Sequence, residues 1–259
     1  MVGLTSTAAA RSAAEEAALK AGVQIVELDG SDMSSLGSII ESVWGIEQVP
    51  QQTLVQGMAH AGNVILAAFK GEEAVGFSIG YLGWDDGLHM HSHMTATTKN
   101  SRSIGVGFAL KMYQRAICLE NNVNEIRWTY DPLIARNANF NLRKLGATVK
   151  SFLPDFYKIM TDNVNAGDRT DRFEVSWDLN SERTLLALRG KSKILVGTVA
   201  EVTIQSDFES LRSANFDQAL QERERVRNLF HSYFAEGYSV DWNPDGKYAF
   251  SPVDAQISH

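Results

Sequence analysis

Six consecutive residues have the composition of a phosphate-binding turn: Arg102-Ser103-Ile104-Gly105-Val106-Gly107. They follow a strand-like run, residues 88–98, and precede a helix-like run, residues 108–120. Phosphate groups bind free backbone N–H groups at a helix N-terminus, and glycines let them approach the main chain closely. Arg102 adds a positive charge. The spacing predicts a site for a phosphate-bearing ligand; the alternative is a solvent-exposed turn before a helix. A dinucleotide fingerprint is disfavoured because its third glycine is absent.

Three histidines alternate along the strand-like run before this turn: His89, His91 and His93. Successive side chains of a strand point to opposite faces, so all three are expected on one face. Imidazole titrates near pH 6.5, which suits proton transfer. Two other interpretations stay open: solvated histidines, and a metal site. Ligation by all three needs a β-bulge, because His89 and His93 lie about 13 Å apart on an extended strand.

Hydrophobic periodicity and turn residues outline the elements that must position these side chains. Two runs around Gly71-Glu72, residues 63–70 and 73–82, predict a β-hairpin. Further strands are predicted at residues 23–28, 88–98, 125–130, 148–152 and 172–179, and helices at residues 36–44, 52–60, 103–120 and 135–145. This order predicts an α+β fold with a mixed central β-sheet flanked by helices.

The pattern changes after residue 180, where helices are predicted at 181–188 and 216–236 and extended segments at 193–204 and 238–251. We therefore expect three regions. Residues 1–22 form an N-terminal extension, loose or helical, and residues 23–180 form the main domain. Residues 181–259 form a C-terminal extension that packs on that domain or makes an oligomer contact, such as a homodimer.

Composition narrows the classes of function. With 259 residues, 44% hydrophobic and 21% charged, the chain is typical of a soluble globular protein. No apolar run approaches the roughly 20 residues of a membrane-spanning helix, and residues 1–21 lack a signal-peptide core. The single cysteine, Cys118, cannot form an internal disulfide, so we expect a reducing, cytoplasmic location. A net charge of −7 argues against nucleic acid as a partner.

The order of these features resembles the GNAT superfamily of acyl-CoA N-acyltransferases. A strand runs into Arg-x-x-Gly-x-Gly and a helix, and after another strand a second helix ends in Lys144-Leu145-Gly146-Ala147. Residues 155–157, 165–168 and 171–173 also resemble a little-characterised branch of that superfamily, which carries a C-terminal extension. The resemblance implies acetyl-CoA or another acyl-CoA, succinyl-CoA included, as co-substrate, with no metal.

The resemblance also assigns roles to the phosphate-binding turn. Residues 102–107 are expected to hold the pyrophosphate of coenzyme A. The pantetheine arm is expected to lie along the preceding strand, which ends near Thr97, like an added strand. Asn137 and Asn141, one turn apart on the predicted second helix, can hydrogen-bond the pantetheine amides or the thiolate; the alternative is ordinary surface polarity.

Acyl transfer needs a base, because the acceptor amine arrives as an ammonium ion. One branch of the superfamily places a carboxylate nine residues before the motif arginine, and this chain has His93 there. His93 is our first candidate for the base and His91 the second. The tyrosine that often protonates the departing thiolate is replaced by Leu142. Tyr157 and Tyr130 are the replacement candidates, unless the thiolate leaves unaided.

The amine acceptor is expected to be a small, amino-acid-like metabolite. Arg172 and Arg136 can hold a carboxylate, while Trp128 and Tyr130 can line an apolar pocket, together with Phe156 and Tyr157. Ion pairing and core packing are the alternatives for these side chains. Two other functions stay open: a catalytically silent acyl-CoA sensor, because of Leu142, and a histidine-based metal protein.

Overall fold

The computed structural model describes residues 6–101, 104–158, 160, 162–165, 167–192 and 197–252. Contacts divide the chain into two compact units. Unit 1 comprises residues 1–127 with 161–166, and unit 2 comprises residues 128–160 with 167–259. The division falls inside strand β5 (Glu125–Tyr130). It does not coincide with the region limits predicted at residues 22 and 180.

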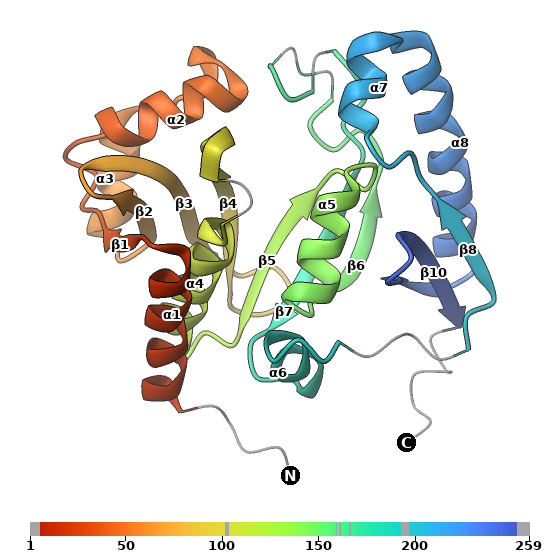
Figure 1. The fold of residues 1–259 in the computed structure, drawn as a ribbon. Helices are drawn as coiled ribbons and strands as arrows, with labels where there is room; N and C mark the ends of the chain where they lie inside the picture. Colours follow the sequence, from red (N-terminus) through yellow and green to blue (C-terminus); the bar gives the residue numbers. More distant parts are fainter. Residues whose placement is uncertain are drawn as a thin grey trace. The chain divides into compact units, whose positions relative to one another are not determined.

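Unit 1 contains a sheet in the order β1-β2-β3-β4-β5 (Figure 1). Its first four strands are antiparallel to one another: β1 (Gln24–Glu27), β2 (Val64–Lys70), β3 (Glu73–Gly83) and β4 (His89–Thr97). β4 and β5 are parallel and pair at two positions, Met90 with Ile126 and His91 with Arg127. The predicted hairpin and the mixed sheet are therefore confirmed.

Two helices, α2 (Ser34–Trp44) and α3 (Gln52–His60), cover one face of this sheet, with a short helical turn, η1 (Ile46–Gln48), between them. The core on this face is apolar and consists of Met33, Leu36, Ile39, Ile40, Val55, Ile65, Ala67, Phe77 and Ile79. The helical periodicity read from the sequence at residues 36–44 arises because those positions face this core.

The opposite face of the sheet packs against α4 (Val106–Glu120). Glycines let the sheet and helix approach closely: a Cβ at Gly76 would lie 2.9 Å from Val106. The first helix, α1 (Thr7–Ala21), lies against α4 through a buried alanine stripe: Ala10, Ala14, Ala17, Ala18 and Ala21 (Figure 1). The predicted N-terminal extension is thus helical over these residues and part of unit 1.

Unit 2 combines strands β5, β7 (Arg172–Asp178) and β6 (Thr148–Leu153) with most of the C-terminal segment. A second sheet has the order β8-β10-β9, made of Ala200–Thr203, Lys247–Pro252 and Tyr238–Trp242. Helix α8 (Phe216–Ala235) buries Val226 and Phe230, as its periodicity predicted. Rings from β6, β7, α8 and β10 pack together in the core: Phe152, Phe173, Phe230, Phe234, Tyr248 and Phe250.

Three local predictions need correction. The helix predicted at residues 135–145 is a short α-helix, α5 (Ala135–Ala138), followed by a π-helical turn, η3 (Asn139–Lys144). The extended segment predicted at 193–204 is a strand only at β8, and residues 193–196 lie outside the described part. Helix α7 (Phe208–Ala214) was not predicted from the sequence. The helix predicted at residues 181–188 is present as α6 (Glu182–Leu188). No helix within the described residues is long and apolar enough to cross a membrane.

Candidate active site

The predicted phosphate turn joins β4 to α4 in unit 1. A short helical turn, η2 (Lys99–Ser101), follows β4, and Gly105 is the N-cap residue of α4 with φ +96°. That left-handed conformation favours glycine. Because Gly105 has no side chain, the N-cap residue itself leaves the first N–H groups of α4 for a ligand. Arg102 and Ser103 lie outside the described residues.

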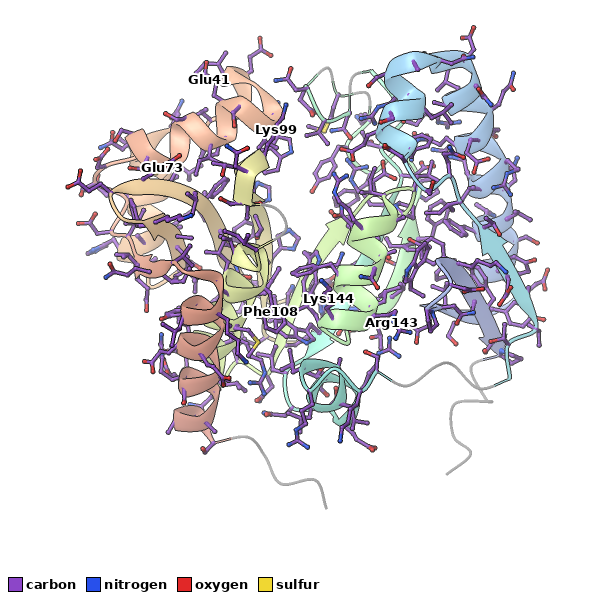
Figure 2. The ribbon with its side chains drawn as sticks, in the orientation of Figure 1. Glu41, Glu73, Lys99, Phe108, Arg143 and Lys144 are labelled. Atoms are coloured by element: carbon purple, nitrogen blue, oxygen red, sulfur yellow. The ribbon has the colours of Figure 1, made fainter. Side chains whose placement is uncertain are left out.

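Residues on both sides of Gly105 have distinct environments. Ile104 is 42% exposed, whereas Val106 is buried beside Gly76. Thr97 ends β4 and pairs with Gly76. Lys99, which the sequence analysis did not select, adds a cation to the same turn, and Figure 2 labels it together with Phe108 of α4. Lys99 could have been selected from the sequence, because it lies only three residues before Arg102 and adds a second positive charge near the predicted phosphate site.

Strand β4 has a partly unpaired edge. On one side it pairs with β3 along its whole length. On the other side, pairing with β5 covers only Met90 and His91 among the described residues. The backbone from Ser92 to Thr97 therefore has the free edge that a peptide-like ligand arm needs to add as a strand.

β4 also carries a β-bulge, which sequence alternation could not reveal. Ile79 of β3 pairs with Met94 and Gly80 pairs with Ser92, so His93 is the extra residue. The three histidines consequently do not form the regular stripe that we predicted. A bulge re-aims the side chain at that position and bends the strand.

The histidines have different surroundings. His89 is buried and its Nδ1 donates to the Gly87 carbonyl at 2.9 Å. His91 and His93 lie near Tyr81 of β3, with ring centroids 5.2 and 5.6 Å from the tyrosine ring, and 6.0 Å from each other. Tyr81 was not selected from the sequence, although the antiparallel register of β3 with β4 places it opposite His91.

These surroundings change how the imidazoles titrate. Burial, and secondarily the charge of His93, lowers the pKa of His91 to about 4. His93 is exposed by surface area, yet nearby protein atoms still lower its pKa by desolvation. Both rings are therefore expected to be neutral at pH 7 and able to accept a proton. Together with Tyr81 they form a cluster of neighbouring rings at the β4 bulge.

The candidates in unit 2 are more deeply packed. Trp128 is buried, and its Nε1 donates to Oδ1 of Asn141 at 3.2 Å. Tyr130 is buried, with its hydroxyl 3.3 Å from that of Tyr248. Burial raises the pKa of Tyr130 far above its usual value, which weakens it as a proton donor. The geometry favours the packing role that the sequence left open for Trp128 and Tyr130.

The π-helical turn changes the two asparagines. Asn137 lies in α5 and is half-buried, whereas Asn141 lies in η3 and is buried. Since η3 does not have α-helical spacing, the regular one-turn relation predicted between them is interrupted. Leu142, at the position of the usual tyrosine, is buried.

Tyr157 and Arg172 lie together in unit 2. The Arg172 guanidinium stands over the Tyr157 ring, 5.4 Å from its centroid, and the Tyr157 hydroxyl lies 3.4 Å from Thr129 Oγ1. Arg172 is buried and donates to the Asp171 carbonyl at 2.9 Å. Arg136 forms an ion pair with Glu209 of α7, so pairing within the protein accounts for it.

Metal binding receives no support from the described residues, which contain no group of three or more His, Cys, Asp or Glu able to hold an ion. His89 Nδ1 donates to the Gly87 carbonyl.

Two solved structures are similar to this chain in fold. The ribosomal-protein-S18-alanine N-acetyltransferase from Escherichia coli superposes with a TM-score of 0.50 at 12% identity, covering 61% of this chain and 95% of its own. Naa20 from Chaetomium thermophilum, in complex with a bisubstrate analogue, has a TM-score of 0.50 at 12% identity, covering 66% of this chain and 92% of its own.

The chain has the GNAT fold. The expected fold class is thereby confirmed. The sequence matches no protein-family model and no curated protein, so this likeness is one of structure. The β4–α4 turn, the partly unpaired β4 edge and the β4 bulge belong to one strand–turn–helix unit of this chain.

Proposed function

We propose that this protein is an N-acyltransferase that moves an acyl group from acyl-CoA to a primary amine. The observation that carries the proposal is the β4–α4 junction. There, a strand with a free edge runs into a glycine N-cap at φ +96°, within a GNAT fold. The diphosphate of coenzyme A would bind the first N–H groups of α4 and Arg102. The pantetheine arm would pair with β4 between Ser92 and Thr97.

The proposed reaction is direct attack in a ternary complex. The deprotonated amine nitrogen forms a bond to the thioester carbonyl carbon, and the carbon–sulfur bond then breaks to release coenzyme A. His93 would take the ammonium proton, directly or through water, with His91 as the second candidate. Tyr157 is the proposed donor to the thiolate, which can also leave unaided because thiols have a pKa near 8.5.

For the acceptor we propose an amino-acid-like amine, held through its carboxylate near Arg172. The E. coli neighbour is named for acetylation of an alanine of a ribosomal protein. Peptide N-termini therefore belong in any test beside free amino acids and polyamines. A reducing, cytoplasmic location is proposed on the single, buried Cys118.

The test is release of free coenzyme A thiol from acetyl-, succinyl- and longer acyl-CoAs with a panel of amines. Amine-dependent release that is lost in His93→Ala supports the proposal. Leu142 favours one alternative, because a buried leucine supplies no hydroxyl. Coenzyme A binding without thioester consumption across the panel would establish that alternative, a silent acyl-CoA sensor.

A further inference from the structure

A chain of buried polar groups lies between α4 and the sheet of unit 1. Lys111 and Gln114, one turn apart on α4, are its helical members, and both are buried, Lys111 being only 3% exposed. The Lys111 Nζ donates to Ser92 Oγ at 2.7 Å, and Ser92 Oγ donates to Gln114 Oε1 at 3.0 Å. None of these groups has a role in the proposed reaction.

The chain continues onto β3 and returns to β4. Gln114 Nε2 donates to Ser78 Oγ at 2.6 Å. The Ser78 hydroxyl lies 2.7 Å from Thr95 Oγ1 and 3.3 Å from the Met94 carbonyl oxygen. The network thus holds β4 at Ser92, before the bulge, and at Met94 and Thr95, after it.

The geometry of a strand explains why this arrangement requires the bulge. Ser92 and Thr95 are three residues apart, so in a regular strand their side chains would point to opposite faces. Both instead join one network on the α4 side of the sheet. The extra residue between them, His93, makes this possible, because a bulge shifts the alternation of side chains between the two faces by one residue. A bulge outside the segment from Ser92 to Thr95 would leave these two side chains on opposite faces.

Burying a lysine opposes folding, so the network needs a reason beyond stability. Desolvation lowers the pKa of Lys111 to about 7, which reflects that penalty. Replacing a buried charged or polar group with an apolar side chain of similar volume often leaves the protein equally stable or makes it more stable. What a fully hydrogen-bonded network adds is one defined arrangement.

We propose that Lys111 and Gln114 are positioning residues that fix the β4 bulge at His93. They touch neither the acyl-CoA nor the amine. By fixing the bulge they set the direction of the His93 ring. The proposal depends on the N-acyltransfer function proposed above for its catalytic consequence, but the effect on the bulge can be measured without turnover.

Gln114→Leu tests the proposal, because it removes both amide hydrogen bonds and keeps a buried side chain. Misplacing a reactive group by 1 Å can cost about 100-fold in rate, so we expect kcat to fall about 10- to 100-fold. The KM for acyl-CoA should change less than about threefold, because the phosphate turn is untouched. Ser78→Ala, a smaller change, breaks the same network from β3 and serves as the second variant if Gln114→Leu does not fold.

The matched control is Leu110→Ala, which leaves a cavity at a fully buried position of α4 that carries no side-chain hydrogen bond. Backbone amide chemical shifts and hydrogen exchange at His93 and Met94 report the bulge directly. They should change in Gln114→Leu and Ser78→Ala and stay as in wild type in Leu110→Ala. Equal effects of the network variants and the control, on kcat and on these amides, overturn the proposal.

A wild-type protein with no turnover on any amine would overturn the proposed function instead. The amide measurements then decide the bulge proposal alone. Unchanged exchange at Met94 in both network variants refutes it, and faster exchange upholds the bulge-fixing role of the network to which Lys111 and Gln114 belong.

Discussion

His91 and His93 are separated by one residue, yet their surroundings give them different chemistry. A base of pKa about 4, such as His91, is neutral across physiological pH but takes a proton from an ammonium ion with difficulty. His93 is more exposed and its pKa is lowered by desolvation alone. The residue-level balance therefore favours His93 as the proton acceptor, with His91 and Tyr81 as its ring neighbours.

We predict that activity falls at acid pH as His93 becomes protonated. Because its pKa lies below the usual 6.5, kcat/KM should still be high at pH 6.5 and decline only at lower pH. His93→Gln should lower kcat/KM about 100-fold or more and remove the decline of kcat/KM at low pH, the acid limb of the profile. The measurement is the pH profile of wild type and variant with one amine. An acid limb that persists in His93→Gln would assign the base elsewhere.

Lys111 gives a prediction about stability. The folded protein binds the Lys111 proton more weakly than the unfolded chain does, because burial lowers the pKa from 10.5 to about 7. The free energy of unfolding should therefore rise as the pH increases from about 7 toward 10.5, with a slope of about 1.4 kcal/mol per pH unit. Lys111→Met should be more stable than wild type at pH 7 and lack this rise.

Urea unfolding at several pH values measures the effect of Lys111, with the exposed Lys70→Met as control for the loss of one charge. Equal pH dependence in wild type and Lys111→Met would mean that the lysine is solvated. A variant that is stabilised but slower would agree with the positioning role, since buried polar groups often trade stability for specificity.

The turn between β4 and α4 is the element on which ligand binding depends. Gly105 has φ +96°, and an added Cβ would meet nothing closer than Ala21 at 3.7 Å. Strain of the left-handed backbone, about 1–2 kcal/mol, is therefore the main cost of Gly105→Ala. We predict that the variant weakens coenzyme A binding about tenfold, as the first N–H groups of α4 turn away from the phosphates.

Gly62→Ala is the matched control for Gly105→Ala. Gly62 also has a positive φ, +84°, with no atom within 4 Å of an added Cβ, and it lies in the turn after α3. Both variants should lose similar stability in thermal unfolding, but Gly62→Ala should bind coenzyme A as wild type does. Equal affinities of Gly105→Ala and wild type in calorimetry would contradict the assignment of the turn.

Elements with a local signal could be predicted from the sequence. The hairpin around Gly71 has apolar runs on both sides of a glycine turn, and α8 repeats its apolar positions at helical spacing. The β4 bulge has no such signal, because Ser92 contacts Gln114, and Thr95 contacts Ser78, only after the strands and helix have packed. The π-helical turn at Asn139–Lys144 likewise arises from packing, with Asn141 drawn toward Trp128.

At the scale of the whole molecule, the segment that contains the substrate candidates Phe156, Tyr157 and Arg172 also connects elements within unit 2. Arg223 of α8 is 1% exposed and donates to the carboxylates of both Asp131 and Asp168. Arg227 pairs in the same way with Asp155 and Asp171. Asp155, Asp168 and Asp171 thus connect the segment before β7 to α8.

We predict that Arg223→Met destabilises unit 2 by about 3–5 kcal/mol, because it removes the guanidinium that pairs with both Asp131 and Asp168, while Arg212 stays 3.6 Å from Asp168. Burial alone would raise the pKa of Asp131, and the charge of Arg223 holds it below the usual value. Arg225→Met is the control: its pair with Glu222 on the same helix is exposed and should contribute less than about 1 kcal/mol. Similar losses in urea unfolding for the two variants would show that Arg223 is not essential to unit 2.

The most direct measurement is a calorimetric titration of coenzyme A into the purified protein. We predict saturable binding of one coenzyme A per chain, which salt weakens because the phosphate charges contribute to it. Arg102→Ala should weaken this binding further. A folded protein that gives no binding heat with millimolar coenzyme A would contradict the assignment of the β4–α4 turn, and with it the proposed acyl transfer.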